Sequence, residues 1–207
     1  EIRTPLNAVI GLTHLCLQTD LTQQQNDYLA KVISSATALL DLLNNILDFS
    51  KIEAGKLAME STTFFMDEVI GDVVAIIGAK CQEKNLEFFI DTKKNVPQCL
   101  EGDPLRLGQI LTNLTSNAVK FTQSGEVTIK TEVLEDLDDS VLLQYTVQDT
   151  GIGLSQEQIS HLFQEFSQGD ASITRKFGGT GLGLVISKRL VTMMGGEIRV
   201  ESTLGQG

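Results

Sequence analysis

The chain has 207 residues, which is enough for one or two domains with real hydrophobic cores. With 27 acidic against 16 basic residues its net charge is -11, so nucleic acid is excluded as a general partner and no contact with an anionic membrane is expected. Three scattered cysteines and two histidines, His14 and His161, predict neither a disulfide framework nor a His-rich metal site. No run of about 18 apolar residues is present, so no segment is predicted to cross a membrane.

The first 58 residues predict two helices. Apolar residues form a broad face along residues 1–19, and a longer helix runs from about Thr22 to Lys56. Two helices cannot bury faces this wide between them, so we expect a second copy and a four-helix bundle dimer. In the longer helix apolar residues recur every three or four positions and form a heptad-like seam. The seam consists of Leu29, Val32, Ala36, Leu39, Leu43, Ile46 and Phe49.

A domain boundary is predicted at residues 55–61, after which short strands mix with helices over residues 59–207. Adjacent strands joined by a tight acidic turn at 135–139 indicate an α/β sandwich with one layer of each kind. Strands are predicted at 62–66, 86–91, 126–134, 141–148 and 197–201, and helices at 67–83, 104–120, 155–166 (capped by Ser155) and 182–194.

The predicted helix at 104–120 carries a polar face. Asn113, Asn117, Lys120 and Phe121 are spaced i, i+4, i+7 and i+8 and therefore share one side of the helix. A carboxamide oxygen suits Mg²⁺, and a lysine can neutralise phosphate. Taken alone, the segment fits an ordinary amphipathic helix with a solvated polar face at least as well.

A second motif, Asp149-Thr150-Gly151-Ile152-Gly153, follows a predicted strand. A carboxylate at a strand end can accept a hydrogen bond from the amino group of adenine, and the glycines let the base approach the backbone. A simple turn is the alternative for the segment alone. Asp-Thr-Gly is also the aspartic-protease triplet, but that chemistry needs two such carboxylates on an all-β fold. One triplet among long helices argues against it.

A third motif, Gly-Gly-Thr-Gly-Leu-Gly-Leu at 178–184, leads into a helix. Its N–H groups and the helix dipole can receive a phosphate, and Arg175 and Lys176 precede it. It lacks the Gly-Lys-Ser/Thr end of a Walker A loop, and a polar loop stands where a dinucleotide motif needs a strand. A flexible loop is the alternative for this segment alone.

In this order and on these elements, the motifs resemble the N, G1 and G2 boxes of the GHKL (Bergerat) ATP-binding fold, with an F box at 163–166. Residues 1–7 (EIRTPLN) resemble the H box of sensor histidine kinases without its first residue, the phosphoacceptor histidine. Residues 1–58 look like a HisKA dimerisation domain and 59–207 like a HATPase catalytic domain. Residues 48–55 are typical of hybrid kinases.

The resemblance implies a homodimeric, ATP- and Mg²⁺-dependent protein-histidine kinase of a two-component system. The γ-phosphoryl group would pass to a histidine immediately before Glu1, and then to an aspartate of a response regulator or of the protein's own receiver domain. Glu1 would orient the imidazole and accept its proton. Thr4 would position water for dephosphorylating the regulator. The chain would be the cytoplasmic part of a membrane-anchored sensor.

The resemblance also implies a nucleotide site. Asn117 would ligate Mg²⁺, Asn113 and Lys120 would contact phosphates, and Asp149 would hold adenine. The electrostatics of such positioning supplies most of phosphoryl-transfer catalysis. The other nucleotide contacts would be Phe121, Gly151, Gly153, Arg175, Lys176, Gly179, Thr180, Gly181, Leu182 and Gly183.

Two other functions stay open. GHKL enzymes that hydrolyse ATP with water place a glutamate four residues before the Mg²⁺ asparagine, where this chain has Asn113 and so lacks that base. The alternative without an enzyme is an ATP-binding regulatory scaffold that does not turn ATP over. Measurable phosphotransfer separates the scaffold from the kinase.

Overall fold

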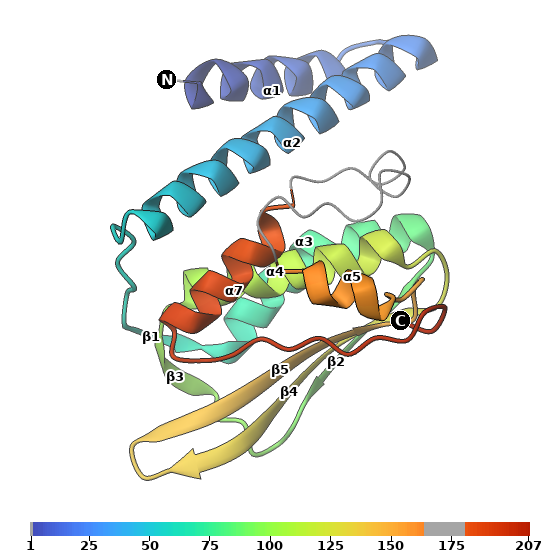
Figure 1. Ribbon diagram of the computed structural model, residues 1–207. Coiled ribbons are helices and arrows are strands. Elements are labelled where there is room, and N and C mark those ends of the chain that lie inside the picture. The colour runs from blue at the N-terminus through green and yellow to red at the C-terminus, as the bar shows by residue number, and fades with distance from the viewer. Residues whose placement is uncertain (1, 164–180) are drawn as a thin grey trace. The chain divides into compact units, whose positions relative to one another are not determined.

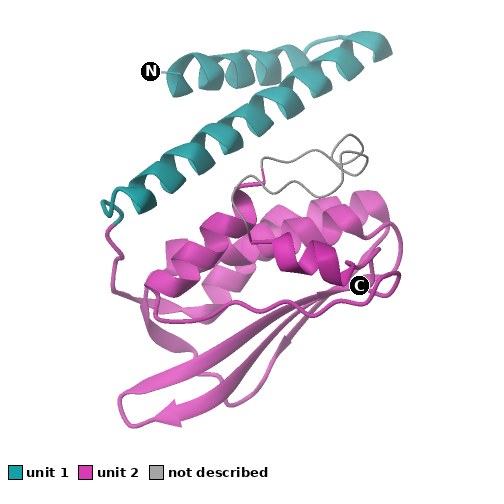
Figure 2. Ribbon diagram, in the orientation of Figure 1, with its two compact units in different colours: residues 1–57 teal, residues 58–207 magenta. Residues whose placement is uncertain are grey.

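The computed structural model describes residues 2–163 and 181–207. Figure 2 shows the chain as two compact units, Glu1–Leu57 and Ala58–Gly207. Each unit has its own secondary structure and is described separately.

The first unit is a hairpin of α1 (Arg3–Leu17) and α2 (Gln23–Glu53) (Figure 1). Thr22 is the N-cap of α2. Its hydroxyl accepts a hydrogen bond from the Gln25 N–H group at 3.3 Å, while the Gln25 side chain accepts one from the Thr22 N–H group at 2.8 Å. This reciprocal capping box satisfies donors that the first helical turn leaves without partners.

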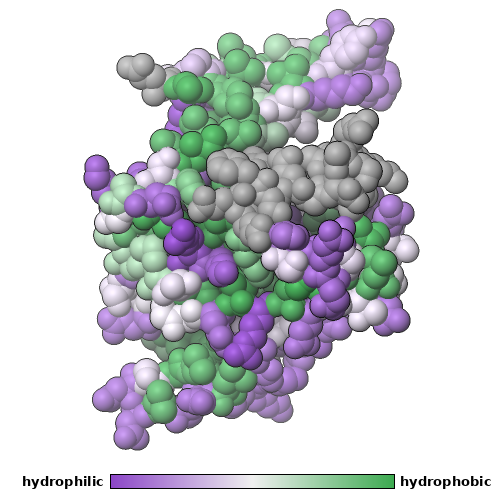
Figure 3. Space-filling view, in the orientation of Figure 1, coloured by the Kyte–Doolittle hydropathy of each residue, from purple (hydrophilic) through white to green (hydrophobic). Residues whose placement is uncertain are grey.

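Three of the seven residues of the predicted seam of α2 are exposed. Ala36 is buried, but Val32, Leu39 and Ile46, each seven residues apart, are 40%, 47% and 44% exposed. Hydrophobic side chains gather on the hairpin surface in Figure 3. Apolar residues repeated at this spacing are the pattern of a helix that packs on another helix.

Among the described residues α2 also has the length and composition of a membrane-spanning helix. An 18-residue stretch of it has a mean hydropathy of 1.2, and 6% of that stretch is buried. This is weak evidence, because helices that pack within soluble proteins pass the same test. The absence of membrane contact stays a prediction.

The second unit is the predicted α/β sandwich. Its main sheet has the order β2-β4-β5, with β2 parallel and β5 antiparallel to β4. The helices α3, α4 and α7 lie on one side of this sheet (Figure 1). A smaller antiparallel pair joins β1 to β3. The strands are β1 (Thr62–Phe65), β2 (Glu87–Thr92), β3 (Cys99–Gly102), β4 (Glu126–Leu137) and β5 (Ser140–Asp149), and the helices are α3 (Met66–Lys84), α4 (Pro104–Phe121), α5 (Gln156–His161) and α7 (Gly183–Met193).

The core lies between the sheet and the helices. Val127 and Ile129, two positions apart on β4, point to the same face and are fully buried. They belong to one hydrophobic cluster with Val73 and Ile77 of α3 and Leu111 of α4. This packing fixes α4, the helix that carries the first polar motif, against the sheet.

Two strand predictions were wrong. β3 was not predicted, and the segment 197–201 was predicted as a strand but is not one. Ile198 and Val200 are half-buried between exposed neighbours, which is the alternation that indicated a strand. A strand also needs a hydrogen-bonded ladder, and the described residues provide none for this segment.

Other boundaries differ in detail. The acidic turn is only the two residues Asp138 and Asp139, because both flanking strands extend further than predicted. Ser155 caps α5 through a capping box, as predicted. The last residues of the helix predicted at 155–166 lie outside the described residues.

Candidate functional site

The helix α4 is held at its start by a buried carboxylate. Asp103, 5% exposed, accepts hydrogen bonds from the N–H groups of Arg106 at 3.0 Å and Glu60 at 3.1 Å. Pro104 follows it at the first helical position, where its missing N–H group would have no helical partner. The predicted polar residues of α4 are half-buried at the edge of the apolar face. That face consists of Leu107, Ile110, Leu111, Thr115, Ala118 and Val119.

Asn113 connects α4 to the start of α7. Its amide nitrogen donates a hydrogen bond to the Ser187 hydroxyl at 2.8 Å. A Cβ atom on Gly183, the first residue of α7, would lie only 2.5 Å from the Asn113 amide oxygen. The glycine therefore allows α7 to begin directly against Asn113. The expected contact between Asn113 and phosphate stays a prediction.

Lys120 and Phe121 end α4 together. The Lys120 ammonium lies 4.9 Å from the centre of the Phe121 ring, within cation–π range. Burial lowers the pKa of Lys120, because removing water disfavours the charged form. A phosphate beside this ammonium would favour its charged form and reverse that effect.

Asp149 is the last residue of β5. One carboxylate oxygen, Oδ1, accepts a hydrogen bond from the Gly151 N–H group at 2.8 Å. The Thr122 hydroxyl is 3.5 Å from the same oxygen, but its single proton is better placed toward the Ala118 carbonyl at 2.7 Å. Among the described residues no hydrogen bond to Oδ2 is observed, so this oxygen can accept one from a ligand.

Gly151 brings the loop after β5 against the end of α4. A Cβ atom there would lie 2.7 Å from Oδ1 of Asp149 and 2.7 Å from the Phe121 carbonyl oxygen. Both distances are shorter than real Cβ contacts, so only glycine fits without a shift of the backbone. The predicted role of Gly151 in shaping a pocket rests on this close approach.

Gly153 meets the C-terminal turn of the chain. It has φ +61°, and a Cβ atom would clash with the carbonyl of Thr203. Next to it the Gly205 N–H group donates a hydrogen bond to the Ile152 carbonyl at 2.7 Å. The sequence did not indicate this packing, which brings Gly205 of the C-terminal turn to the site.

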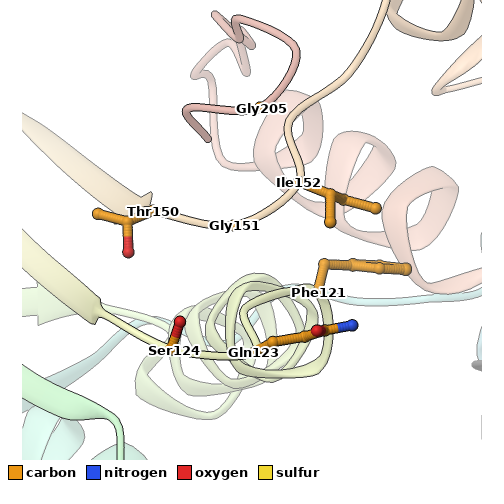
Figure 4. A pocket seen from close by; sticks show the side chains of 7 residues that line it. All are labelled: Phe121, Gln123, Ser124, Thr150, Gly151, Ile152 and Gly205. Atoms are coloured by element: carbon orange, nitrogen blue, oxygen red, sulfur yellow. The ribbon is translucent and has the colours of Figure 1, made fainter.

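A pocket of about 280 Å³ opens between these segments. Figure 4 shows Phe121 from α4 and Ile152 from the loop presenting apolar side chains to the same space. An apolar pair of this kind suits a flat ring such as a nucleobase. Asp149 does not line the pocket itself, but its Oδ1 accepts a hydrogen bond from Gly151, which does. The lining residues are Phe121, Gln123, Ser124, Thr150, Gly151, Ile152 and Gly205.

Of the remaining predicted residues, the structure describes some and not others. Gly181 has φ +70°, Leu182 is 3% exposed, and both directly precede α7. Thr4 is exposed on α1 in the first unit. Five predicted residues lie outside the described part of the chain, namely Glu1, Arg175, Lys176, Gly179 and Thr180.

The described residues contain no group of three or more His, Cys, Asp or Glu side chains that could hold a metal ion. Mg²⁺ does not need such a cage, because it keeps several waters and is commonly held by one or two protein oxygens together with substrate phosphates. The half-buried amide of Asn117 therefore fits Mg²⁺ that arrives with a nucleotide.

Sequence reasoning missed several residues that form the site. Gln123, Ser124 and Ile152 line the pocket, and Ser187 orients Asn113. Ser187 carries a usable signal, because it is a polar residue, 2% exposed, within the apolar stripe of α7. A buried hydroxyl needs a partner, and the sequence does not identify that partner.

Known proteins resemble the chain over its whole length. The sensor histidine kinase GacS of Pseudomonas protegens is 52% identical over 207 residues, which is all of this chain and 23% of that protein. The signal transduction histidine-protein kinase BarA of Escherichia coli is 47% identical over 207 residues, all of this chain and 22% of that protein. The chain thus spans less than a quarter of these relatives.

A solved structure agrees with the fold. The crystal structure of full-length ShkA in complex with AMPPNP matches with a TM-score of 0.77 and 32% identity, over 99% of this chain and 42% of that one. Two families match the sequence, the His Kinase A (phospho-acceptor) domain over residues 1–55 and the histidine kinase-, DNA gyrase B- and HSP90-like ATPase over residues 102–207. The fold class and the resemblance expected from the motifs are both confirmed. The chain belongs to the sensor histidine kinases, with a phosphoacceptor-type helical region followed by an ATPase domain of the GHKL fold.

Proposed function

We propose that this chain is the catalytic core of a sensor histidine kinase of the hybrid type. The observation that carries the proposal is the meeting of Phe121, Gly151 and Asp149 at the end of the helix that bears Asn117. This meeting gives one site an apolar wall, a carboxylate oxygen that can accept a hydrogen bond, and an amide. The residue ranges of the two domains are proposed to be 1–58 for dimerisation and phosphotransfer and 59–207 for ATP binding.

In this proposal adenine lies between Phe121 and Ile152, with its amino group donating to Asp149. The triphosphate extends along α4 toward the start of α7, where the first N–H groups of the helix have no helical partner. Lys120 contacts the phosphates. Support for ATP as the nucleotide comes from ShkA, whose structure contains an ATP analogue.

Asn117 is proposed to ligate Mg²⁺ that the nucleotide carries. The ion would neutralise charge on the phosphate oxygens during transfer. Asn113 stands where water-activating relatives have a glutamate, and its amide already donates to Ser187. An amide cannot act as a general base at neutral pH, which favours transfer to a protein side chain over hydrolysis.

The acceptor is proposed to be a histidine immediately before Glu1, and the next acceptor an aspartate of a response regulator or of a receiver domain in the same protein. Thr4 follows on the same helix and is proposed to serve a phosphatase reaction on that aspartate. The exposed seam of α2 supports a homodimer through residues 1–58. The chain is proposed to work in the cytoplasm as part of a membrane-anchored sensor.

The test is phosphorylation of the chain extended N-terminally through the preceding residues. With γ-labelled ATP and Mg²⁺ we expect a label that is acid-labile and base-stable, as a phosphohistidine is. Asn117→Ala should lose the label by at least about a hundredfold, as removal of a charge-stabilising group does. Asn95→Ala, an exposed asparagine in the loop after β2, is the matched control and should keep it.

Each contrary outcome has a different consequence for the proposed function. ATP binding without any label would favour the regulatory scaffold. Release of inorganic phosphate without protein labelling would favour a water-using ATPase. Absence of nucleotide binding would remove the basis for the site.

A further inference from the structure

Lys84, the last residue of α3, lies against the end of α4. Its ammonium donates hydrogen bonds to the carbonyl oxygens of Val119 at 2.6 Å, Lys120 at 3.0 Å and Thr122 at 3.2 Å. An ammonium has three donors, and these three carbonyls use all of them. Lys84 therefore has no donor left for a phosphate, and any role in nucleotide binding is exerted through α4.

The end of α4 needs such a contact. The last carbonyls of a helix have no helical donors, and they are commonly satisfied by a following residue in the left-handed conformation. Here the C-cap Thr122 is extended, with φ -93° and ψ 124°, and the residue after it, Gln123, does not have a positive φ, so the chain leaves the helix without that motif. A cation at a helix C-terminus also offsets the negative end of the helix dipole.

The carbonyls that Lys84 holds belong to residues directly next to those that line the pocket. Phe121 lies between Lys120 and Thr122, and Gln123 and Ser124 follow as further lining residues. The Phe121 carbonyl is also the atom against which Gly151 packs. A shift of this last turn would move both the apolar wall and the loop that carries Asp149.

We propose that Lys84 is a positioning residue for the nucleotide site, which holds the last turn of α4 so that Phe121 and the loop after β5 form the pocket for the base. The inference rests on the proposed function as a nucleotide-binding kinase. Lys84 acts on the base end of the nucleotide, because the start of α4 is fixed separately through Asp103 and its middle through the bond between Asn113 and Ser187.

The experiment compares Lys84→Met, Lys84→Arg and wild type in the extended chain. The control is Lys80→Met, an exposed lysine one turn earlier on α3. Calorimetric titration well below the melting temperature gives the Kd for a non-hydrolysable ATP analogue and for its GTP counterpart. Hydrogen exchange of the amides at 121–124 reports on the last turn of α4 without nucleotide.

We expect Lys84→Met to raise the Kd for the ATP analogue about tenfold, the usual effect of losing one charged hydrogen-bonding group. It should also reduce the preference for ATP over GTP, speed exchange at 121–124 and change kcat at saturating ATP by less than about twofold. Lys84→Arg should restore most of the affinity, and Lys80→Met should match wild type.

An unchanged Kd and an unchanged ATP preference in a folded Lys84→Met chain would overturn the inference and leave Lys84 as a helix cap alone. A lower melting temperature by itself would not count in favour, because any cap contributes to stability. If wild type binds neither analogue, the proposed function fails and the inference fails with it. Wild-type binding therefore separates the two failures.

Discussion

The helices α2 and α4 are both amphipathic, but they place their apolar faces differently. In α4 the face is covered within the chain, with Leu111 and Val119 only 1% and 2% exposed. In α2 the seam residues Leu39 and Ile46 are 47% and 44% exposed. Burial of apolar surface drives both folding and association, so the same pattern serves packing inside a domain in α4 and indicates a partner in α2.

The largest effect is expected from the covered face. Leu111→Ala leaves a cavity between α4 and the sheet and should lower the free energy of unfolding by about 3 kcal/mol. The equivalent change on the open face, Leu39→Ala, should cost less than about 1 kcal/mol in dilute protein, since that side chain is half exposed before the change. Urea unfolding followed by circular dichroism measures both. Equal losses would contradict the distinction between the two helices.

The exposed apolar face of α2 can be tested by placing a charge on it. Leu39→Glu should raise the dissociation constant of the proposed dimer at least about a hundredfold, because it would place a carboxylate in the apolar centre of the proposed interface. Leu105→Glu, at a 69% exposed leucine of α4, is the matched control. Sedimentation equilibrium reports the mass of each variant. A Leu39→Glu chain that stays dimeric would show that the seam does not form the interface.

The site itself can be changed without touching either apolar face. Gly151→Ala forces a methyl group to within 2.7 Å of Asp149 Oδ1 and of the Phe121 carbonyl unless the loop moves. We expect about tenfold weaker nucleotide binding, an effect of about 1.4 kcal/mol. Gly78→Ala, in open space on α3, should bind as wild type does. Titration calorimetry decides, and equal binding by both variants would place the nucleotide elsewhere.

The smallest effect is a pH dependence. The pKa of Lys120 is lowered by desolvation, and a bound phosphate would raise it again. Affinity should therefore fall as the pH rises through the lowered pKa, below the ordinary value of 10.5, by up to roughly tenfold for one lost charge contact. Lys120→Arg should flatten the profile, because guanidinium stays charged. A profile that Arg does not alter would assign the titration to another group.

The lowered pKa of Lys120 also makes the stability of the fold depend on pH, in a direction that can be worked out. A lysine whose pKa is lower in the folded state than in the unfolded state loses its proton more readily in the folded state. The unfolded chain then binds more protons between the lowered pKa and 10.5. In that window the Lys120 contribution to stability improves as pH rises.

Local patterns predicted most of the fold. Helical periodicity identified α2 and α4, and Thr22 and Ser155 marked helix starts because their hydroxyls cap backbone donors. The strand β3, which was not predicted, has only four residues, and the alternation at 197–201 reflects half-burial without a ladder. Periodicity reports which side of a segment is buried, and it does not report whether a neighbouring strand is available.

The site could be predicted only where its parts are local. The motif residues on α4 and after β5 follow from spacing within one element. The contacts that hold them do not, because Asn113 and Ser187 are 74 residues apart and Lys84 and Val119 are 35 apart. Such pairs depend on how helices pack on the sheet, which no local pattern encodes.

In the proposed function, α4 and the loop after β5 bind a nucleotide together with Mg²⁺. The most direct measurement is calorimetric titration of a non-hydrolysable ATP analogue into wild type and Asn117→Ala, with and without Mg²⁺. We expect Mg²⁺ to tighten binding to wild type about tenfold or more and to have little effect on the variant. Identical effects of Mg²⁺ on the two proteins, or no binding to wild type, would contradict a nucleotide site in which Asn117 ligates Mg²⁺.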